Sequence, residues 1–220
     1  MVSLSPVKLR FHAEAIAYAK DAGDVSFSAC VHRVNKSPLA GQPFKVFDMT
    51  GRLVCTLPPP DEKESQRTVR LPEKGFYRIF CEVNPHALVF TGCDAPLGIV
   101  PPQSGEKIRP KQRGAINVYR SEGTVYFPVQ ENIPSAFVCG GGGAEKISAV
   151  LRNASGAQVA EWKNCGSWGF FRTDAAQQGL WRAELARPDG GYIWEDSYIA
   201  LLGKPAVFFL TDIKYWKELK

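Results

Sequence analysis

The sequence lacks most of the features that mark membrane, metal-binding and cofactor-binding proteins. Its 220 residues contain no apolar run of about 18 residues, the length that a membrane-spanning helix needs. The first residues, MVSLSPVKLRF, have no long apolar core of a signal peptide. The six cysteines form no C-x-x-C pair, which argues against a zinc ribbon or a thioredoxin-like dithiol. We expect no membrane insertion, no metal and no cofactor, and either a cytoplasmic chain or part of a longer one whose export signal lies elsewhere.

Positive charge is too scarce and too isolated to indicate a nucleic-acid partner. The formal net charge is +5, and the densest basic segment, residues 107–113 (KIRPKQR), carries four positive charges. Nucleic-acid-binding surfaces interleave such charges with aromatic rings, whereas the neighbours here include proline, glutamine and glycine. We interpret the segment as a solvated linker and expect no nucleic acid to bind.

The segment Cys139–Lys146, CGGGGAEK, is the one stretch that looks like a phosphate-binding loop. A P-loop needs the pattern G-x-x-x-x-G-K-[ST]. Counted from Gly140, the second glycine of that pattern falls on Glu145 and the hydroxyl falls on Ile147. The residues that follow favour a strand, not the helix of a dinucleotide-binding fold. We interpret the glycines as a connection between strands, where glycine supplies positive φ at low cost.

No catalytic constellation is visible elsewhere. There is no G-x-S-x-G elbow, and the three histidines, at 12, 32 and 86, share no motif. Glu195 and Asp196 are adjacent, so on a strand they point to opposite faces and cannot act together on one bond. We expect no catalytic residues, and we expect that the protein is not an enzyme.

Sustained helical periodicity is nearly absent, which favours an all-β fold. Residues 12–22 (HAEAIAYAKDA) suit a helix by propensity, yet their alanines alternate with larger residues as in a strand. Short β-branched and aromatic runs bounded by turn residues predict strands elsewhere, as in FKVF at 44–47, GFYRIF at 75–80 and AVFFL at 206–210.

Four short patterns recur in the same order, 100 to 105 residues apart. They are residues 23–27 with 123–127, 46–51 with 151–156, 75–78 with 179–182, and 97–98 with 202–203. Such collinear repeats predict an internal duplication. We expect two tandem β-sandwich domains of the jelly-roll or Ig-like kind, 1–103 and 117–220, joined by a linker at 104–116. The glycine run then takes the place that residues 36–43 take in the first copy.

All five tryptophans lie in the second half, at positions 162, 168, 181, 194 and 216. Trp181 falls on the alternating apolar face of its strand, so we expect it in the core. Trp168 lies in NCGSWG between two glycines, which makes it the best candidate for an exposed aromatic platform, although a role in capping one end of the sandwich is open. Trp162 is expected to face the same loop, and Trp216 to dock the C-terminal tail.

The sequence leaves open the exposure of Trp194 and the pairing of two cysteines in the second half. Trp194 shares a strand face with Tyr192 and Asp196, and the alternation does not fix its exposure. Cys139 and Cys165 are the only cysteines of this half, so they either form a disulfide or remain free thiols, because connectivity cannot be read from a sequence.

The order of motifs in the second half carries a resemblance. It runs from GTVYFPV at 123–129 through AFV at 136–138, LRNASG at 151–156, GLWRAEL at 179–185 and WED at 194–196 to LLGKP at 201–205. Over about residues 119–212 this order resembles the accessory, non-catalytic β-sandwich modules of secreted bacterial glycoside hydrolases and related carbohydrate-active proteins. The first half is similar in a general way to bacterial Ig-like and macroglobulin-like strands.

The resemblance implies a non-catalytic carbohydrate-binding or accessory module of a larger secreted protein. A polysaccharide or other glycan would be its ligand, and a catalytic domain would lie in the same longer chain. Sugar rings would stack on aromatic side chains while polar groups bind the hydroxyls, which gives the candidate ligand-binding set Trp168, Trp162, Trp194, Tyr192, Arg172, Asn164 and Asp196. The alternative is a structural or protein-interaction β-sandwich module that binds no glycan.

Overall fold

The computed structural model describes residues 1–39, 42–101, 114–130, 133, 135–142, 144–173, 175–203 and 207–213. The all-β prediction is confirmed, since this part of the chain holds 17 strands and a single short 3-10 turn, Ala175–Gln177. No helix in these ranges has the length and apolar character needed to cross a membrane. The basic segment 107–113, most of the predicted linker and Trp216 lie outside the described residues.

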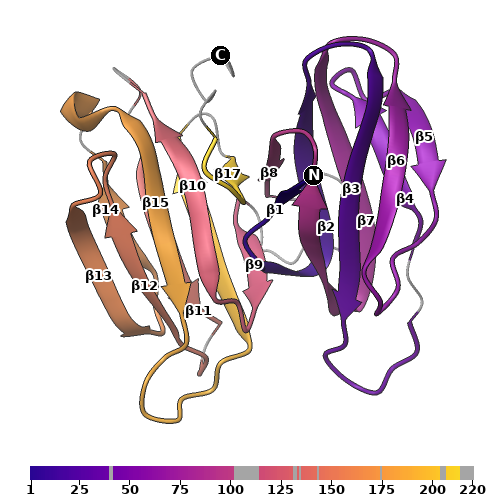
Figure 1. The fold of residues 1–220 in the computed structure, drawn as a ribbon. Helices are drawn as coiled ribbons and strands as arrows, with labels where there is room; N and C mark the ends of the chain where they lie inside the picture. The colour runs from indigo at the N-terminus through magenta and orange to yellow at the C-terminus, as the bar shows by residue number, and fades with distance from the viewer. Residues whose placement is uncertain are drawn as a thin grey trace.

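The strands form two sandwiches that stand side by side (Figure 1). In the first half, one layer, A1, has the order β5 (Leu53–Leu57), β4 (Phe44–Asp48), the start of β7 (Gly75–Cys93), the end of β2 (Lys8–Ala19) and β8 (Leu97–Ile99). The facing layer, B1, has the order β6 (Ser65–Leu71), β3 (Gly23–His32), the end of β7, and then β1 (Val2–Ser3) with the start of β2.

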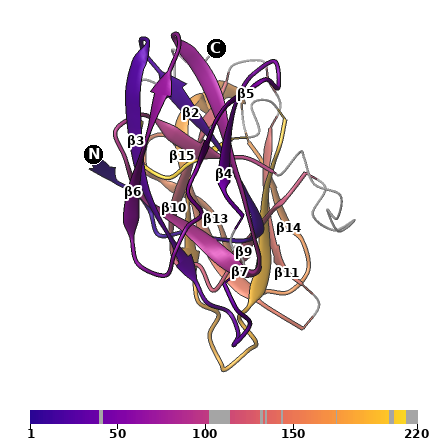
Figure 2. The same ribbon diagram turned by 90° about the vertical axis from the view of Figure 1, so that its right-hand side faces the viewer.

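The second half repeats this arrangement with separate strands. Layer A2 has the order β17 (Phe208–Phe209), β10 (Gly123–Val129), β15 (Gly179–Ala186), β12 (Ile147–Arg152) and β13 (Gln158–Cys165). Layer B2 has the order β9 (Ile116–Tyr119), β16 (Asp196–Leu202), β11 (Ala136–Gly141) and β14 (Gly169–Arg172). Figure 2 looks at the first half with the second half behind it.

Two long strands of the first half pass from one layer to the other. β2 pairs with β7 through Lys8–Arg10 in layer B1 and through His12–Ala19 in layer A1, with a register shift at Phe11, whose φ is 65°. In β7 the pairing with β2 is interrupted after Glu82, where the Asn84–Pro85 peptide bond is cis. A bulge of this kind bends a strand and redirects its pairing, so both layers of the first half share these two strands.

Alternating side chains fill the space between the layers. Facing layers meet through aromatic pairs: Phe27 with Phe44 at 5.2 Å, Phe127 with Phe137 at 5.8 Å, and Phe171 with Trp181 at 6.2 Å between ring centroids. The prediction that Trp181 is a core residue is confirmed, because only 1% of it is exposed. In the second part of β2 the alanines at 13, 15, 17 and 19 are buried. Of the larger residues that alternate with them, His12, Ile16 and Tyr18 are partly exposed, whereas Glu14 is buried and accepts a hydrogen bond from Arg78.

The order of pairing is the same in both halves. β15 lies between β10 and β12 as the start of β7 lies between β2 and β4. β11 pairs with β14 and β16 as β3 pairs with β6 and the end of β7. The glycine-rich connection from β11 to β12 therefore takes the same place in the pairing order as the connection from β3 to β4.

Two of the four recurring patterns occupy corresponding places. In the turns after β4 and β12, a single side chain accepts two backbone hydrogen bonds. Asp48 accepts from the N–H groups of residues 50 and 52, and Asn153 accepts from the N–H groups of residues 155 and 157. Tyr77 and Trp181 likewise each donate to the carbonyl four residues earlier. The other two matches are wrong: residues 23–27 begin β3 in layer B1 whereas 123–127 begin β10 in layer A2, and residues 97–98 begin β8 whereas 202–203 end β16.

The prediction that the glycine run supplies positive φ is wrong for the three glycines that the structure describes. Gly140, Gly141 and Gly142 are not among the glycines with positive φ, and Gly143 lies outside the described residues. A Cβ atom on Gly140 would lie 2.7 Å from the carbonyl oxygen of Ser167, and one on Gly141 would lie 1.8 Å from that of Glu145. Close backbone approach, not backbone conformation, therefore excludes side chains here.

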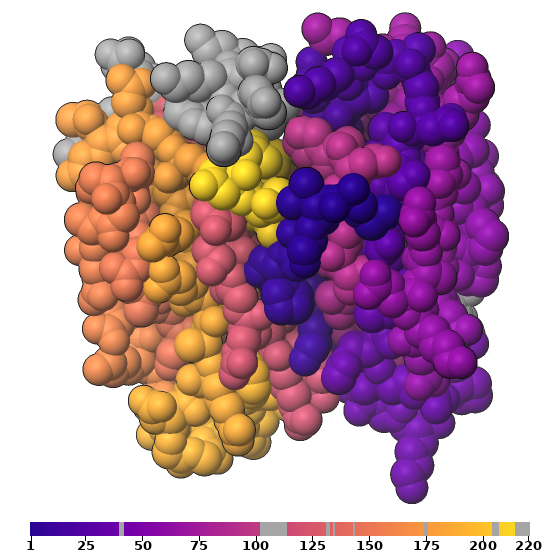
Figure 3. Space-filling model, in the orientation of Figure 1, coloured from indigo at the N-terminus to yellow at the C-terminus, as the bar shows by residue number. Residues whose placement is uncertain are grey.

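The halves meet at a seam made of paired strands. β8 pairs with β17 between layers A1 and A2, and Leu9 of β2 pairs with Val118 of β9 between layers B1 and B2. The N-terminal segment adds hydrogen bonds from Ser5 N–H to the Leu210 carbonyl (2.7 Å) and from Lys8 N–H to Ser121 Oγ (2.9 Å). Figure 3 shows this indigo segment against the yellow residues of the C-terminal strand. The domain boundaries at 103 and 117 remain a prediction.

Candidate functional site

A recess lies at the end of the second half where β15 ends and β16 begins. It encloses about 410 Å³ of solvent-accessible space and is lined by Arg120, Arg187, Tyr192, Ile193, Trp194 and Glu195. Five of these residues belong to the loop 187–195, and Arg120 directly follows β9. The loop is the orange connection at the foot of the second half in Figure 1. The recess therefore joins one long loop to the end of a strand beside the seam.

Hydrogen bonds to neighbouring turns hold this loop in place. Its chain reverses at Gly190 and Gly191, whose φ values of 75° and 72° favour glycine. The N–H of Asp189 donates to Asn164 Oδ1 (2.8 Å), and the N–H of Lys146 donates to the Ile193 carbonyl (2.9 Å). The loop is thus fixed against the connection that follows β11 and against the end of β13.

Arg120 fixes the inner wall of the recess. Its guanidinium donates to the carbonyl of Trp194 through Nε (3.1 Å) and to Glu195 Oε1 through Nη2 (2.9 Å). Its own N–H donates to the Glu195 carbonyl (3.1 Å). Because the guanidinium is a planar fork of donors, one side chain fixes both the backbone and the carboxylate of the loop. Glu195 and Asp196 have separate partners, since Asp196 forms an ion pair with Arg10 (3.1 Å) that lacks hydrogen-bond alignment.

The aromatic rings of the recess lie beside cations. The Arg187 guanidinium carbon lies 5.8 Å from the ring centroid of Trp194, and Lys146 Nζ lies 5.8 Å from that of Tyr192, which are cation–π distances. Tyr192 is 50% exposed, so half of the residue is open to solvent. The indole N–H of Trp194 is buried and has no hydrogen-bond acceptor in the described structure.

Positive charge next to the recess affects two neighbouring groups. Burial, followed by repulsion from Lys8 and Arg120, lowers the pKa of His32. Burial also lowers the pKa of Lys8, with Arg120 adding to the effect and Glu122 opposing it. On the other side of the loop, burial raises the pKa of Glu145. Lys8, His32 and Arg120 therefore lie close together beside the recess.

The structure brings five of the seven predicted residues to this end of the second half. Trp194 and Tyr192 line the recess, and Asn164 and Asp196 hold its supporting loops. Trp168 is 53% exposed but lies outside the recess, on the outer face of layer B2, with its ring centroid 5.8 Å from that of Tyr198.

The other two predicted residues lie elsewhere. The Trp162 ring packs against Phe137, with the centroids 5.6 Å apart, and a Cβ atom on Gly169 would lie 2.3 Å from its Nε1. Trp162 therefore lies against Gly169, the last residue of NCGSWG, with its ring packed on the core and outside the recess. Arg172 is exposed at the far end of β14, beside Ala136.

Sequence reasoning missed Arg120, Arg187 and Ile193, and considered Glu195 only as half of a carboxylate pair. Arg120 lies 74 residues before Trp194 in the chain, so no local spacing connects them. The available signal was the cluster of arginine, proline and glycine in RPDGG at 187–191, which predicts a turn directly before two aromatic residues.

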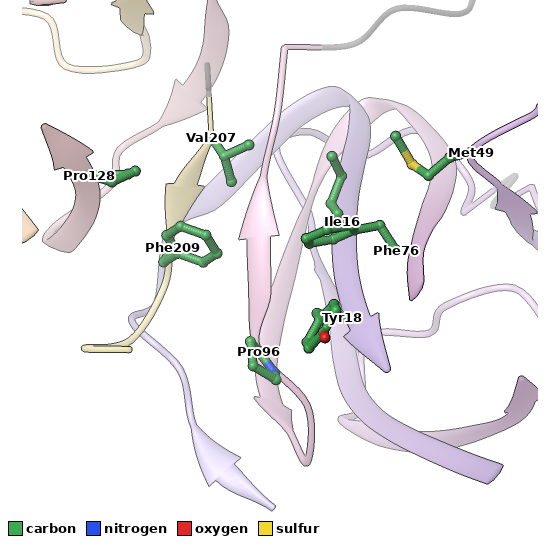
Figure 4. A pocket seen from close by; sticks show the side chains of 8 residues that line it. All are labelled: Ile16, Tyr18, Met49, Phe76, Pro96, Pro128, Val207 and Phe209. Carbon is green, nitrogen blue, oxygen red and sulfur yellow. The ribbon is translucent and has the colours of Figure 1, made fainter. Parts of the chain in front are cut away.

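A second concavity lies on the outer face of the seam and has a different chemistry. Its lining is Ile16, Tyr18, Met49, Phe76, Pro96, Pro128, Val207 and Phe209, around about 180 Å³ of accessible space. Figure 4 shows these side chains facing one another across β8, and the only polar side-chain atom among them is the Tyr18 hydroxyl oxygen. A sugar placed here would lose hydrogen bonds to water without replacement, which is costly. We call this surface the apolar groove.

The cysteines and acidic groups offer no further site. Cys139 and Cys165 are free thiols in the structure, with Cys165 Sγ 3.7 Å from the Cys139 carbonyl oxygen, and burial strongly raises the pKa of Cys139. Among the described residues no group of three or more His, Cys, Asp or Glu side chains is placed to hold a metal ion.

No family model matches the sequence, and no curated protein matches it. Among solved structures, one match is the M60 catalytic domain with the CBM51-1 and CBM51-2 domains from Clostridium perfringens ZmpB, at 9% identity and a TM-score of 0.32. That match covers 94% of this chain, which spans 36% of the other. Another is the N-terminal CBM22-1–CBM22-2 tandem domain of Paenibacillus barcinonensis Xyn10C, at 11% identity and a TM-score of 0.24, covering 85% of this chain and 80% of the other. At these TM-scores the likenesses carry no argument about function.

Proposed function

We propose that the protein is a non-catalytic carbohydrate-binding or accessory module of a larger secreted carbohydrate-active protein, and that the recess holds the sugar. The observation that carries this proposal is the composition of the recess, in which Trp194 and Tyr192 stand beside two guanidinium groups and a carboxylate. Ligand sites combine apolar walls with a few placed polar groups. An aromatic ring offers an apolar face to the C–H groups of a sugar, and the charged side chains offer hydrogen bonds to its hydroxyls.

The same proposal includes a division of the chain into two domains within a longer protein. We infer that residues 1–103 and 117–220 are two domains that arose by duplication, and the repeated order of strand pairing supports this. The partners would be a glycan and a catalytic domain in the same longer chain.

Affinity electrophoresis of the protein through gels containing soluble polysaccharides tests the sugar-binding role. We expect retention on at least one polysaccharide and a loss of about tenfold or more in affinity for Trp194→Ala, because removing one central aromatic anchor commonly costs that much. Circular dichroism and thermal unfolding would check that the variant is folded. Retention on no polysaccharide would refute the proposal.

Trp168→Ala serves as the comparison that locates the sugar. Trp168 is more exposed than Trp194 but lies outside the recess, so its removal is expected to leave retention within about twofold. If Trp168→Ala abolished retention and Trp194→Ala did not, the sugar would bind on the outer face of layer B2, and the assignment to the recess would be wrong.

A specific observation also favours the alternative, a protein-interaction module. The apolar groove presents Phe76, Phe209 and Val207 with almost no polar atoms between them, which suits apolar side chains of another protein better than water. Under this alternative, Phe76→Lys would dissociate a purified complex that Trp194→Ala leaves intact. The opposite result would exclude the groove as the interface.

A further inference from the structure

We propose that the recess recognises an acidic sugar, through the carboxylate or sulfate group that the sugar carries. This inference rests on the proposed carbohydrate-binding function and names the class of glycan. Its basis is Arg187, which lines the recess and has no acidic side chain within ion-pair distance among the described residues. Arg187 is exposed, so its guanidinium is free to form charge-assisted hydrogen bonds with an anion supplied from outside.

Arg187 carries the charge of the recess that no carboxylate of the recess balances. Arg120 and Glu195 already bind each other at 2.9 Å, so together they add no net charge. What remains is the guanidinium of Arg187, which is exposed and offers several N–H donors. A ligand that carries an anionic group satisfies these donors.

Arg187 lies beside an aromatic ring of the recess. Its guanidinium carbon lies 5.8 Å from the centroid of the Trp194 ring, which is a cation–π distance. A carboxylate or a sulfate accepts two parallel hydrogen bonds from a guanidinium. The sugar ring that carries the group would then lie next to Tyr192, whose ring is half exposed. Charge recognition and stacking are thus available at adjacent positions.

The test compares each acidic polysaccharide with its neutral counterpart, using the full chain. Polygalacturonate would be set against its methyl ester, which keeps the backbone and removes the carboxylates, and dextran sulfate against dextran. We expect at least one acidic member to bind about tenfold more tightly than its neutral counterpart, with affinity falling as salt is raised. A preference within the polygalacturonate pair would identify a carboxylate as the anion, and a preference within the dextran pair would identify a sulfate.

Three variants connect the preference to the recess. Arg187→Gln is expected to lose about tenfold in affinity for the acidic ligand and clearly less for the neutral one, for which only a hydrogen bond to a hydroxyl is lost. Arg187→Lys keeps the charge but loses the fork, so an intermediate loss is expected. Arg70→Gln, an exposed arginine on β6 in the first half, is the matched control and should bind as wild type.

The outcomes separate this inference from the proposed function. Equal binding of acidic and neutral members, with loss through Trp194→Ala, would overturn the acidic preference and leave the carbohydrate-binding role intact. Equal losses for Arg70→Gln and Arg187→Gln would overturn the inference as well, because the attraction would then depend on overall charge. Binding to no glycan at all would overturn both.

Discussion

Replacing Gly141 by alanine should destabilise the protein through a backbone clash that the turn cannot relieve. The new Cβ would lie 1.8 Å from the carbonyl oxygen of Glu145 and 2.4 Å from its carbon, whereas such a carbon–oxygen contact is normally about 3.3 Å. The turn must therefore move by about 1.5 Å. It is held by hydrogen bonds from Gly142 N–H to the Asp196 carbonyl (3.1 Å) and from Lys146 N–H to the Ile193 carbonyl (2.9 Å).

The magnitude follows from these contacts. Overpacking costs about 1–3 kcal/mol, and losing one of the two hydrogen bonds costs about 1 kcal/mol, so we expect a loss of about 2–4 kcal/mol. Gly156→Ala is the control, because Gly156 has a φ of 84° with no atom within 4 Å of a new Cβ. That substitution should cost only the backbone term of about 1 kcal/mol.

Urea unfolding measures both variants. With a slope of about 2 kcal/mol/M, the Gly141→Ala midpoint should fall by about 1–2 M and the Gly156→Ala midpoint by about 0.5 M. A Gly141→Ala protein as stable as wild type, or more stable than Gly156→Ala, would show that the turn adapts freely. The argument that close approach selects the glycines would then be refuted.

Three further outcomes are expected. The hydrogen bond from Thr50, followed by other donors of its turn, lowers the pKa of Asp48 to about 2. This pKa in the folded protein lies below that in the unfolded chain, which is about 4. The ionised Asp48 therefore stabilises the folded state fully above pH 4, and this stabilisation is lost as the pH falls towards 2. Wild type should therefore lose more thermal stability than Asp48→Asn over that interval, and equal losses would contradict the assignment. Trp181→Ala should lower the free energy of unfolding by about 3–5 kcal/mol in the same urea assay, and a loss below about 1 kcal/mol would show that its ring is not a core element. At pH 8, iodoacetamide should modify the partly exposed Cys165 before Cys81, because burial raises the pKa of Cys81 to about 12; peptide mapping that finds equal rates would contradict this order.

The alternation of apolar and polar residues along a strand is a local pattern, so it predicts the strands themselves and which side chains point inward. The all-β fold and the inward position of Trp181 follow from residues that are neighbours in the chain. The layer to which a strand belongs does not. Residues 23–27 and 123–127 share a short pattern, but β3 pairs with β6 and β7 whereas β10 pairs with β15 and β17. Only partners distant in sequence decide that difference.

The candidate site was predictable in part for the same reason. Trp194 and Tyr192 stood out because aromatic residues are concentrated in the second half. Arg120 did not, since it reaches the loop only through the pairing of β9 with β16. Trp162 was a candidate because it lies close in the chain to the loop of Trp168, yet its ring contacts Phe137 from the facing layer.

The paired strands at the seam give the molecule a mechanical property that two tethered domains would lack. Hydrogen-bonded neighbours continue without a gap from β5 through β7, β2, β8, β17 and β10 to β13. Backbone hydrogen bonds therefore link the half that holds the recess to the other half. Because neither half can unfold without breaking this pairing, both halves should melt in one transition.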